Sequence, residues 1–301
     1  MTAPGDLLHR FLFERLPVRG HLVRLDASWR AAIEHHAYPE AVTTALGEAM
    51  AASALMAGAL KFEGRLSLQI EASGPVRLLL AQCSHRHSIR GVARYREMPI
   101  ADLGAVALFG EGQLAVTIEQ DERGDRYQGV VSLEQNSLPA CLERYFAQSE
   151  QIPSRLFLTA TPGRAAGLLL QRIGVGAAGG EAGPPAGVDD AWRRISLLAA
   201  TLSPQELLDL SCRDLLRRLF SEDDIRLFEG TPVFFQCSCS RERVSGILQA
   251  LGADEVNSLL RERGDVEVRC EFCNRDWRFD AVDVAGLFSP GPSPRAPRGL
   301  H

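Results

Sequence analysis

Four of the seven cysteines in this 301-residue chain lie in two close pairs near its C-terminal end. The pairs are Cys237-Ser238-Cys239 and Cys270-Glu271-Phe272-Cys273, and 30 residues separate them. Thiolate sulfurs bind Zn²⁺ tetrahedrally, and each pair can supply two ligands from one turn if the two turns meet in space. We therefore predict one zinc ion per chain, with Cys237, Cys239, Cys270 and Cys273 as its ligands.

The residues around the cysteines suit a small module that would hold the two turns together. Residues 231–236 are typical of a strand that enters the first pair, and the apolar spacing over 241–251 predicts a helix. Residues 265–269 alternate like a strand that leads into the second pair. A unit of about 55 residues can hardly bury enough core unaided, so the metal would contribute much of its stability.

The spacing of the cysteines alone leaves several functions open. A structural zinc ribbon that recruits a fixed partner is one alternative. A thiol–disulfide oxidoreductase that acts through Cys270 and Cys273 is another, but it would need that pair at a strand-to-helix junction. We find no Ser/His/Asp group, pair of acids or Gly-rich phosphate loop, so nothing indicates a conventional enzyme.

Charge argues against a nucleic-acid partner for the cysteine-rich region. Residues 231–285 hold seven arginines and ten acidic residues, a net charge of −3, and four thiolates around Zn²⁺ would add two more negative charges. Counterion release from phosphates requires a basic surface, which this region does not offer. The whole chain is acidic as well, with a formal net charge of −5.

The remaining composition indicates a cytoplasmic protein without a membrane partner. With 46% hydrophobic residues the chain can bury a sizeable core, and its length predicts two domains joined by a linker. The longest uncharged apolar run, 49–60, is too short to span a bilayer. The first residues lack the basic and apolar regions of a signal peptide, so we expect a reducing cytoplasm.

The first half of the chain shows runs of neighbouring strands with the helices set apart, which is typical of an α+β domain with a largely antiparallel sheet. Strands are predicted at 7–16, 18–25, 65–72, 76–83, 89–95, 113–119, 127–133 and 156–159. Helices are predicted at 26–36, from 39 to about 60 and from about 138 to 149.

We predict four segments along the chain: an N-terminal α+β domain (1–174), a flexible joint and amphipathic helical linker (175–230), a zinc-binding domain (231–287) and a disordered tail (288–301). Residues 174–187 are rich in Gly, Ala and Pro, as flexible joints are. Ser203, Pro204 and Glu206 form a strong helix-start signal within the linker. The apolar face of the linker should lie on another surface; it comprises Trp192, Ile195, Leu198, Leu202, Leu215 and Leu219.

The sequence resembles those of the 33 kDa chaperonin family. In the cysteine-rich region the resemblance rests on residues 235–244, Phe-Gln-Cys-Ser-Cys-Ser-Arg-Glu-Arg-Val, and on the second pair at the distance expected for the family. Residues 60–64, 145–151 and 166–171 carry it into the N-terminal domain, so it covers nearly the whole chain.

The resemblance implies a redox-regulated, ATP-independent chaperone that holds unfolding client proteins and is not an enzyme. It implies that oxidation converts the four cysteines into the disulfides Cys237–Cys239 and Cys270–Cys273. Zinc would then leave, and unfolding of the module and the linker would expose a client-binding surface. The resemblance further implies a homodimer when active. The other three cysteines, Cys83, Cys141 and Cys212, lie in apolar or helical contexts, and we expect them to be buried thiols without a redox role.

Overall fold

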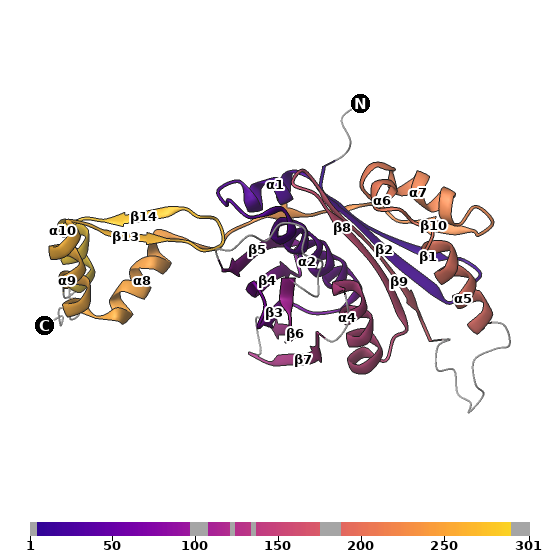
Figure 1. Cartoon of the computed structure of the whole chain (residues 1–301), viewed down its shortest axis with the longest axis horizontal. Coiled ribbons are helices and arrows are strands. Elements are labelled where there is room, and N and C mark those ends of the chain that lie inside the picture. The colour runs from indigo at the N-terminus through magenta and orange to yellow at the C-terminus, as the bar shows by residue number, and fades with distance from the viewer. Residues whose placement is uncertain (1–4, 97–107, 121–123, 134–136, 175–187, 290–301) are drawn as a thin grey trace, which may run out of the picture. The chain divides into compact units, whose positions relative to one another are not determined.

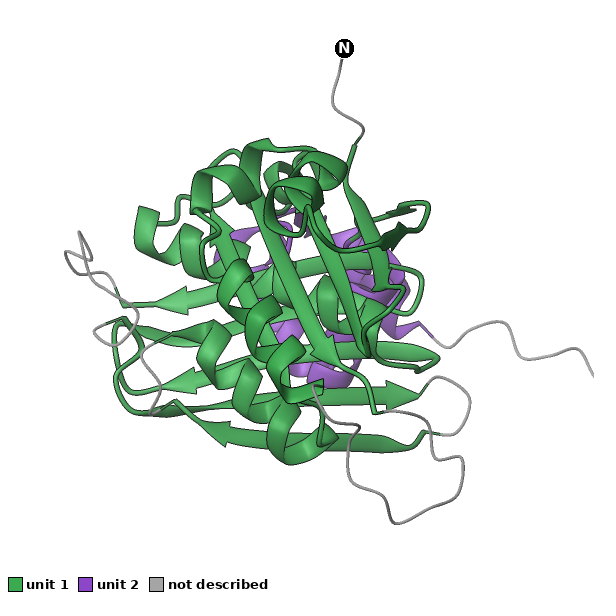
Figure 2. Ribbon diagram, turned by 90° about the vertical axis from the view of Figure 1, so that its right-hand side faces the viewer, with its two compact units in different colours: residues 1–236 green, residues 237–301 purple. Residues whose placement is uncertain are grey.

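The computed structural model of the chain describes residues 5–96, 108–120, 124–133, 137–174 and 188–289. The chain forms two compact units, residues 1–236 and residues 237–301, which Figure 2 distinguishes by colour. Most of the predicted joint (175–187) and most of the predicted tail (290–301) lie outside the described residues.

The described residues of the first unit form two largely antiparallel sheets, in which one pair of strands is parallel. The first sheet has the order β10 (Ile225–Leu227), β1 (Leu7–Phe13), β2 (Val18–Leu25), β9 (Ala165–Arg172) and β8 (Ser154–Ala160), and β11 (Thr231–Pro232) also pairs with β1. The second has the order β12 (Phe234–Phe235), β5 (Ser88–Tyr95), β4 (Val76–Ser84), β3 (Gly64–Ala72), β6 (Gly112–Gln120) and β7 (Arg126–Ser132). The parallel pair is β12 with β5. The predicted fold class, α+β with a largely antiparallel sheet, is confirmed.

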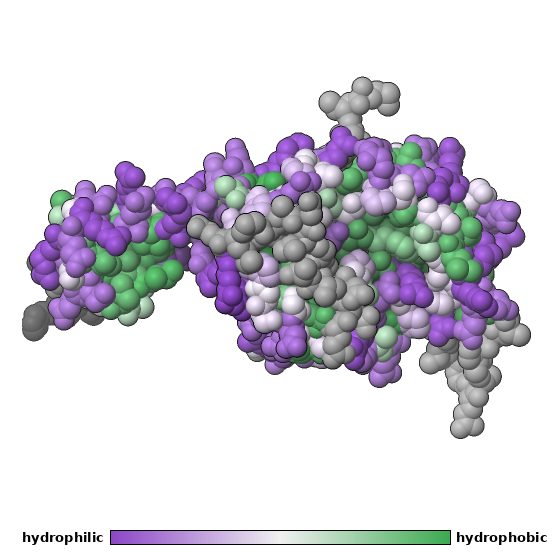
Figure 3. Space-filling view, viewed as in Figure 1, coloured by the Kyte–Doolittle hydropathy of each residue, from purple (hydrophilic) through white to green (hydrophobic). Residues whose placement is uncertain are grey.

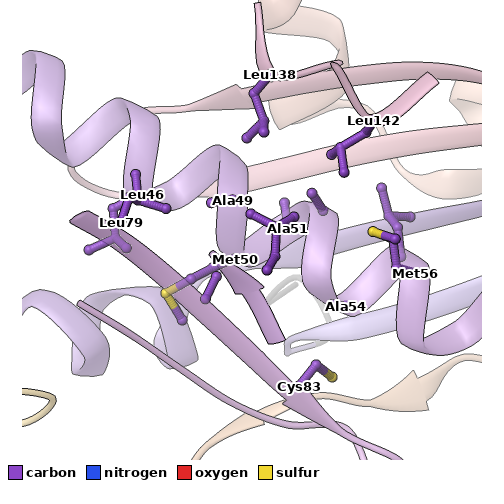
Figure 4. Close-up of a cluster of buried hydrophobic side chains, with 14 of the residues drawn as sticks. Leu46, Ala49, Met50, Ala51, Ala54, Met56, Leu79, Cys83, Leu138 and Leu142 are labelled. Atoms are coloured by element: carbon purple, nitrogen blue, oxygen red, sulfur yellow. The ribbon is translucent and has the colours of Figure 1, made fainter. Parts of the chain in front are cut away.

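Helix α2 (Glu40–Ala59) lies between the two sheets and contacts strands of both (Figure 1). Its small residues allow this close packing: a Cβ at Gly47 would lie 2.5 Å from the Cβ of Ala160 on β8. Larger side chains of the helix, such as Leu46 and Met50, fill the core together with residues of β4 (Figure 4). Among the described residues, α2 alone is long and apolar enough to cross a membrane, but 78% of its most apolar window is buried, as in a core helix.

Helices α1 (Ala27–Ile33) and α4 (Leu138–Tyr145) also belong to this unit. The predicted helix over 138–149 is not uniform, because α4 continues into a π-helical turn, η1 (Phe146–Glu150). The Tyr145 hydroxyl donates to Glu150 Oε1 at 2.9 Å across this turn, and Gln151 ends it in the left-handed region with φ 55°. A wider turn keeps almost the same apolar spacing as an α-helix, so the sequence pattern cannot distinguish the two.

The linker helices α5 (Val188–Ala199), α6 (Pro204–Asp209) and α7 (Cys212–Leu219) lie on the face of the first sheet that α2 does not cover (Figure 1). The predicted helix start at Ser203 is confirmed as a capping box: Glu206 N donates to Ser203 Oγ at 3.2 Å, and Ser203 N donates to Glu206 Oε2 at 3.0 Å. The linker and the sheet share one buried apolar cluster, which includes Ile195, Leu215 and Leu219 from the helices and Phe11, Phe13, Leu22 and Leu168 from the strands.

Residues 231–236, which we call the strap, connect the two sheets of the first unit. Its strand β11 pairs with the start of β1, and its strand β12 pairs with β5. Between them Val233 is only 3% exposed, lies in the main core and donates its N–H to Asp6 O at 3.0 Å. The sequence placed these residues with the cysteine-rich module, whereas here they belong to the first unit and directly precede Cys237.

The second unit contains three helices and a hairpin among its described residues. They are α8 (Arg241–Leu251), α9 (Ala253–Arg263), β13 (Val266–Arg269), β14 (Asp276–Phe279) and α10 (Ala281–Phe288). The predicted helix over 241–251 and the predicted strand over 265–269 are confirmed within one residue. Helix α9, strand β14 and helix α10 were not predicted from the sequence.

Candidate metal centre

The first pair of cysteines lies in the loop between β12 and α8. Ser240 ends this loop as the N-cap of α8, because its side chain accepts the N–H of Arg243 at 3.2 Å. The guanidinium of Arg243 reaches back and donates to Ser238 O at 3.0 Å and to Ser238 Oγ at 2.6 Å. Arg243 therefore holds the residue between Cys237 and Cys239, and with it the direction of both sulfurs.

The second pair lies in the turn of the hairpin formed by β13 and β14. Cys270 N donates to Arg275 O at 3.0 Å, and Asn274 N donates to Cys270 O at 2.8 Å. Asn274 adopts a left-handed conformation with φ 53°, which asparagine tolerates better than most residues. The chain thus turns tightly enough for Cys270 and Cys273 to present their sulfurs on the same side.

The structure brings the four predicted cysteines together. The sulfurs of Cys237 and Cys270 are 3.6 Å apart, those of Cys239 and Cys273 are 3.4 Å apart, and all four lie within 4.8 Å of one another. A zinc ion with four ligands at about 2.3 Å requires sulfurs roughly 3.8 Å apart in a tetrahedron. The cluster therefore fits a single tetrahedral ion whose ligands come from both loops, and within the described residues it is the only such group of metal-ligating side chains.

The crowding of the four sulfurs also indicates a need for a cation. Burial raises the pKa of the Cys237 thiol, and burial together with neighbouring thiols raises the pKa of Cys273 strongly. At Cys270 burial also opposes ionisation, but backbone N–H groups of Cys273 and Phe272 hold its pKa below the ordinary value. Four thiolates at these distances repel one another, so they can ionise together only around a positive ion.

The second unit has a very small apolar core around this cluster. Its fully buried apolar residues are Val244, Leu248, Val256, Val266, Phe279 and Val284. Other apolar side chains remain at the surface: in Figure 3 hydrophobic atoms gather on the face where α8 lies, and Ile247 and Leu251 on that helix are 62% and 53% exposed. So few buried residues contribute little stability, which is consistent with a unit that depends on a metal.

The three remaining cysteines lie in the cores of the first unit, away from solvent. Cys83 and Cys141 belong to the core around α2, and Cys212 belongs to the apolar cluster between linker and sheet. Burial raises the pKa of the Cys83 thiol, and burial raises the pKa of Cys212 to about 12 although the Arg24 guanidinium opposes this. Such thiols are poor nucleophiles at neutral pH.

The sequence predicted that the strap is extended but not which strands it pairs with. Its partner strands, β1 and β5, lie more than 140 residues earlier in the sequence, and each strand of the strap has only two residues. No periodic pattern can be read from so short a strand. The one available signal is Val233, an apolar residue next to a proline in an otherwise extended segment.

Comparison with known proteins gives one consistent result. The model of the Hsp33 protein family matches residues 6–280 of the chain. The 33 kDa chaperonin of Nitrosococcus oceani is 46% identical over 285 residues, which cover 94% of each chain, and that of Azotobacter vinelandii is 45% identical over 296 residues, 96% of each chain. The crystal structure of the 33 kDa chaperonin of Thermotoga maritima has the same fold, with a TM-score of 0.77 at 24% identity over 93% of this chain and 97% of that one.

Proposed function

The chain belongs to the Hsp33 protein family, and from this premise we propose that it is a redox-regulated, ATP-independent chaperone that holds unfolding proteins. The observation that carries the proposal is the cluster of four sulfurs within 4.8 Å in a unit with almost no core of its own. Such a unit is folded when its cysteines bind a metal and unfolded when they are oxidised. It is therefore better suited to act as a redox switch than as a permanent structural support.

The reduced protein carries one Zn²⁺ per chain, held by Cys237, Cys239, Cys270 and Cys273. The bound ion supplies a cross-link between the two loops and keeps all four sulfurs as thiolates. Structural zinc sites contribute about 10–16 kcal/mol to folding, which matches or exceeds the roughly 5–15 kcal/mol stability of a typical domain. The second unit is thus folded only while its four sulfurs are reduced.

Oxidation removes the ligands in balanced two-electron steps. One thiolate of a pair attacks hydrogen peroxide, which forms a sulfenic acid and releases hydroxide. The thiolate of its neighbour then attacks that sulfur, which forms a disulfide and releases a second hydroxide. Two such sequences give Cys237–Cys239 and Cys270–Cys273, the pairing that the family resemblance implies. Each disulfide consumes one peroxide, and neither can hold zinc.

Unfolding of the second unit destabilises the strap and then the linker, which covers the client-binding surface. The strap ends at Gln236, one residue before the first ligand. Several ion pairs fasten the linker, among them Arg164 with Asp209 at 3.0 Å, but such exposed pairs contribute at most about 1 kcal/mol each. The docking rests instead on the shared apolar cluster, and release of the linker exposes that cluster to unfolding proteins.

The binding partners of the activated protein can be inferred from the surface that the linker uncovers. Unfolding client proteins bind the exposed apolar face of the first sheet, and two activated chains associate as a homodimer. The cysteine-rich region 231–285, with its net charge of −3, binds no nucleic acid, the protein needs no membrane, and the cytoplasm is its compartment. The oxidoreductase alternative would need Cys270 and Cys273 at a strand-to-helix junction, whereas they lie in the turn of a hairpin. We therefore propose no enzymatic activity.

The direct test is aggregation of a heat-denaturing client, followed by light scattering. Protein treated with peroxide at stress temperature should suppress the scattering, and the same protein in excess reductant should not. Suppression of equal strength by both forms would exclude redox control and favour a constitutive holdase.

The buried cysteines provide a test of which thiols act as the switch. A protein with Cys83→Ala, Cys141→Ala and Cys212→Ala should release zinc after peroxide treatment at the rate of the unchanged protein, because all three thiols are buried in apolar clusters of the first unit. A chromogenic chelator measures the release. Loss of peroxide-triggered release in the triple variant would show that the redox pairs are assigned wrongly, provided that its zinc content before oxidation is normal.

A further inference from the structure

The outer edge of strand β1 is covered by a segment that returns from the linker, residues 224–233. This segment contains β10 and β11, and both pair with β1 in antiparallel orientation. The backbone bonds that join it to β1 include Phe228 N to Arg10 O at 2.9 Å, Glu14 N to Asp224 O at 2.9 Å and Val233 N to Asp6 O at 3.0 Å.

The pairing fixes which amides of β1 depend on this segment. Leu12 pairs with Arg226, midway between the bonded positions of Arg10 and Glu14. In an antiparallel ladder every second residue turns its N–H and C=O to the same neighbour, so Leu12 also bonds to β10. Phe11 and Phe13 turn their backbone groups to β2 on the other side.

The side chains of residues 224–233 show which kind of strand fits the edge of β1. Ile225 and Leu227 pack into the apolar cluster that the linker shares with the sheet. On the opposite face Arg226 pairs with Glu14 at 2.5 Å, and the Arg10 guanidinium lies 5.2 Å from the centre of the Phe228 ring. The edge is therefore matched by an extended strand with apolar residues at alternate positions.

We propose that, once the linker has left, this edge of β1 binds an extended segment of an unfolding client as an added strand. The inference rests on the proposed function, because the linker must undock before the edge is free. A client strand would bond to the backbone of Arg10, Leu12 and Glu14 and place alternate apolar side chains against Phe11 and Phe13. It would take the place that β10 occupies in the folded chain.

Strand addition explains how one surface could hold many different sequences. Main-chain hydrogen bonds supply affinity that does not depend on side chains, and the apolar pockets beside the strand favour only an alternating pattern. Unfolding proteins expose such segments, which aggregate by pairing with one another at their edges. A client strand bound to β1 is withdrawn from that pairing.

The test is hydrogen exchange at single backbone amides of the full-length protein in three states: reduced, oxidised, and oxidised with reduced, carboxymethylated α-lactalbumin, which stays unfolded. Oxidation should accelerate exchange at Leu12 and Glu14 by at least about tenfold, and binding of the unfolded probe should slow it again by at least about tenfold. The amides of Phe11 and Phe13 serve as the matched control, because they face β2 and should stay protected throughout.

The outcomes separate this inference from the function on which it rests. If Leu12 and Glu14 stay protected after oxidation, the linker does not leave β1 and the proposed release step fails. If oxidation frees them but they keep exchanging while the probe co-elutes with the protein, the chaperone function stands and strand addition is wrong. Protection that returns without the probe and grows with protein concentration would assign the edge to a second copy of the chain, which also overturns the inference.

Discussion

Reduced protein with Cys239→Ser is expected to contain no zinc and to have an unfolded second unit. The three remaining sulfurs leave the tetrahedral site without its fourth ligand, and a serine hydroxyl is a poor zinc ligand. The variant loses most of the metal-dependent folding free energy, which is about 10–16 kcal/mol. A core of six buried apolar residues cannot compensate for this loss. Metal analysis and amide NMR spectra of residues 241–288 measure the two effects.

Ser238→Ala is the matched control for this substitution. It changes the residue between the two cysteines and removes the hydroxyl that accepts from Arg243 at 2.6 Å, but it leaves all four sulfurs in place. We expect it to retain one zinc per chain. Full zinc occupancy in the Cys239→Ser protein would remove Cys239 from the set of ligands.

Leu219→Glu should produce a chaperone that is active while reduced and zinc-loaded. Leu219 is 3% exposed in the cluster between linker and sheet, so the change removes roughly 1.5–3 kcal/mol of burial and adds the cost of desolvating a carboxylate. This is a large share of the stability available to a linker that opens under stress. Light scattering of a heat-denaturing client in excess reductant measures the effect, and zinc content is recorded on the same sample.

Leu197→Glu provides the control on the same linker, because Leu197 on α5 is 62% exposed and loses little burial. It should remain inactive until it is oxidised. The core around α2 is a separate cluster, so far-UV circular dichroism should show that the rest of the first unit stays folded in both variants. A Leu219→Glu protein that is inactive while reduced would mean that the linker does not cover the client surface.

Features that depend on neighbours in the sequence were predictable. The capping residues Ser203 and Glu206 act within one helical turn, and the alternation of residues 65–72 reflects the two faces of a single strand. The cysteine pairs belong to the same class, since each pair occupies one turn and the chemistry of sulfur demands that the turns meet.

Features that depend on distant partners were not predictable. The strap pairs with β1 and β5 through strands of two residues, and its place is set by Val233 in a core built from other parts of the chain. Helix α9 buries only Val256 completely, so it lacks the apolar stripe by which an amphipathic helix is recognised. The sequence showed that the linker has an apolar face but contained no signal for which sheet it would cover.

If the state of the four cysteines controls client binding, zinc loss, disulfide formation and chaperone activity must change together. Zinc release, disulfide formation and suppression of client scattering are followed in the same peroxide-treated sample over time. The three signals should rise together and reach one released zinc and two disulfides per chain, and suppression should be lost again when a reductant and zinc are added. Full zinc release and disulfide formation without any gain in suppression would contradict control of client binding by the cysteines.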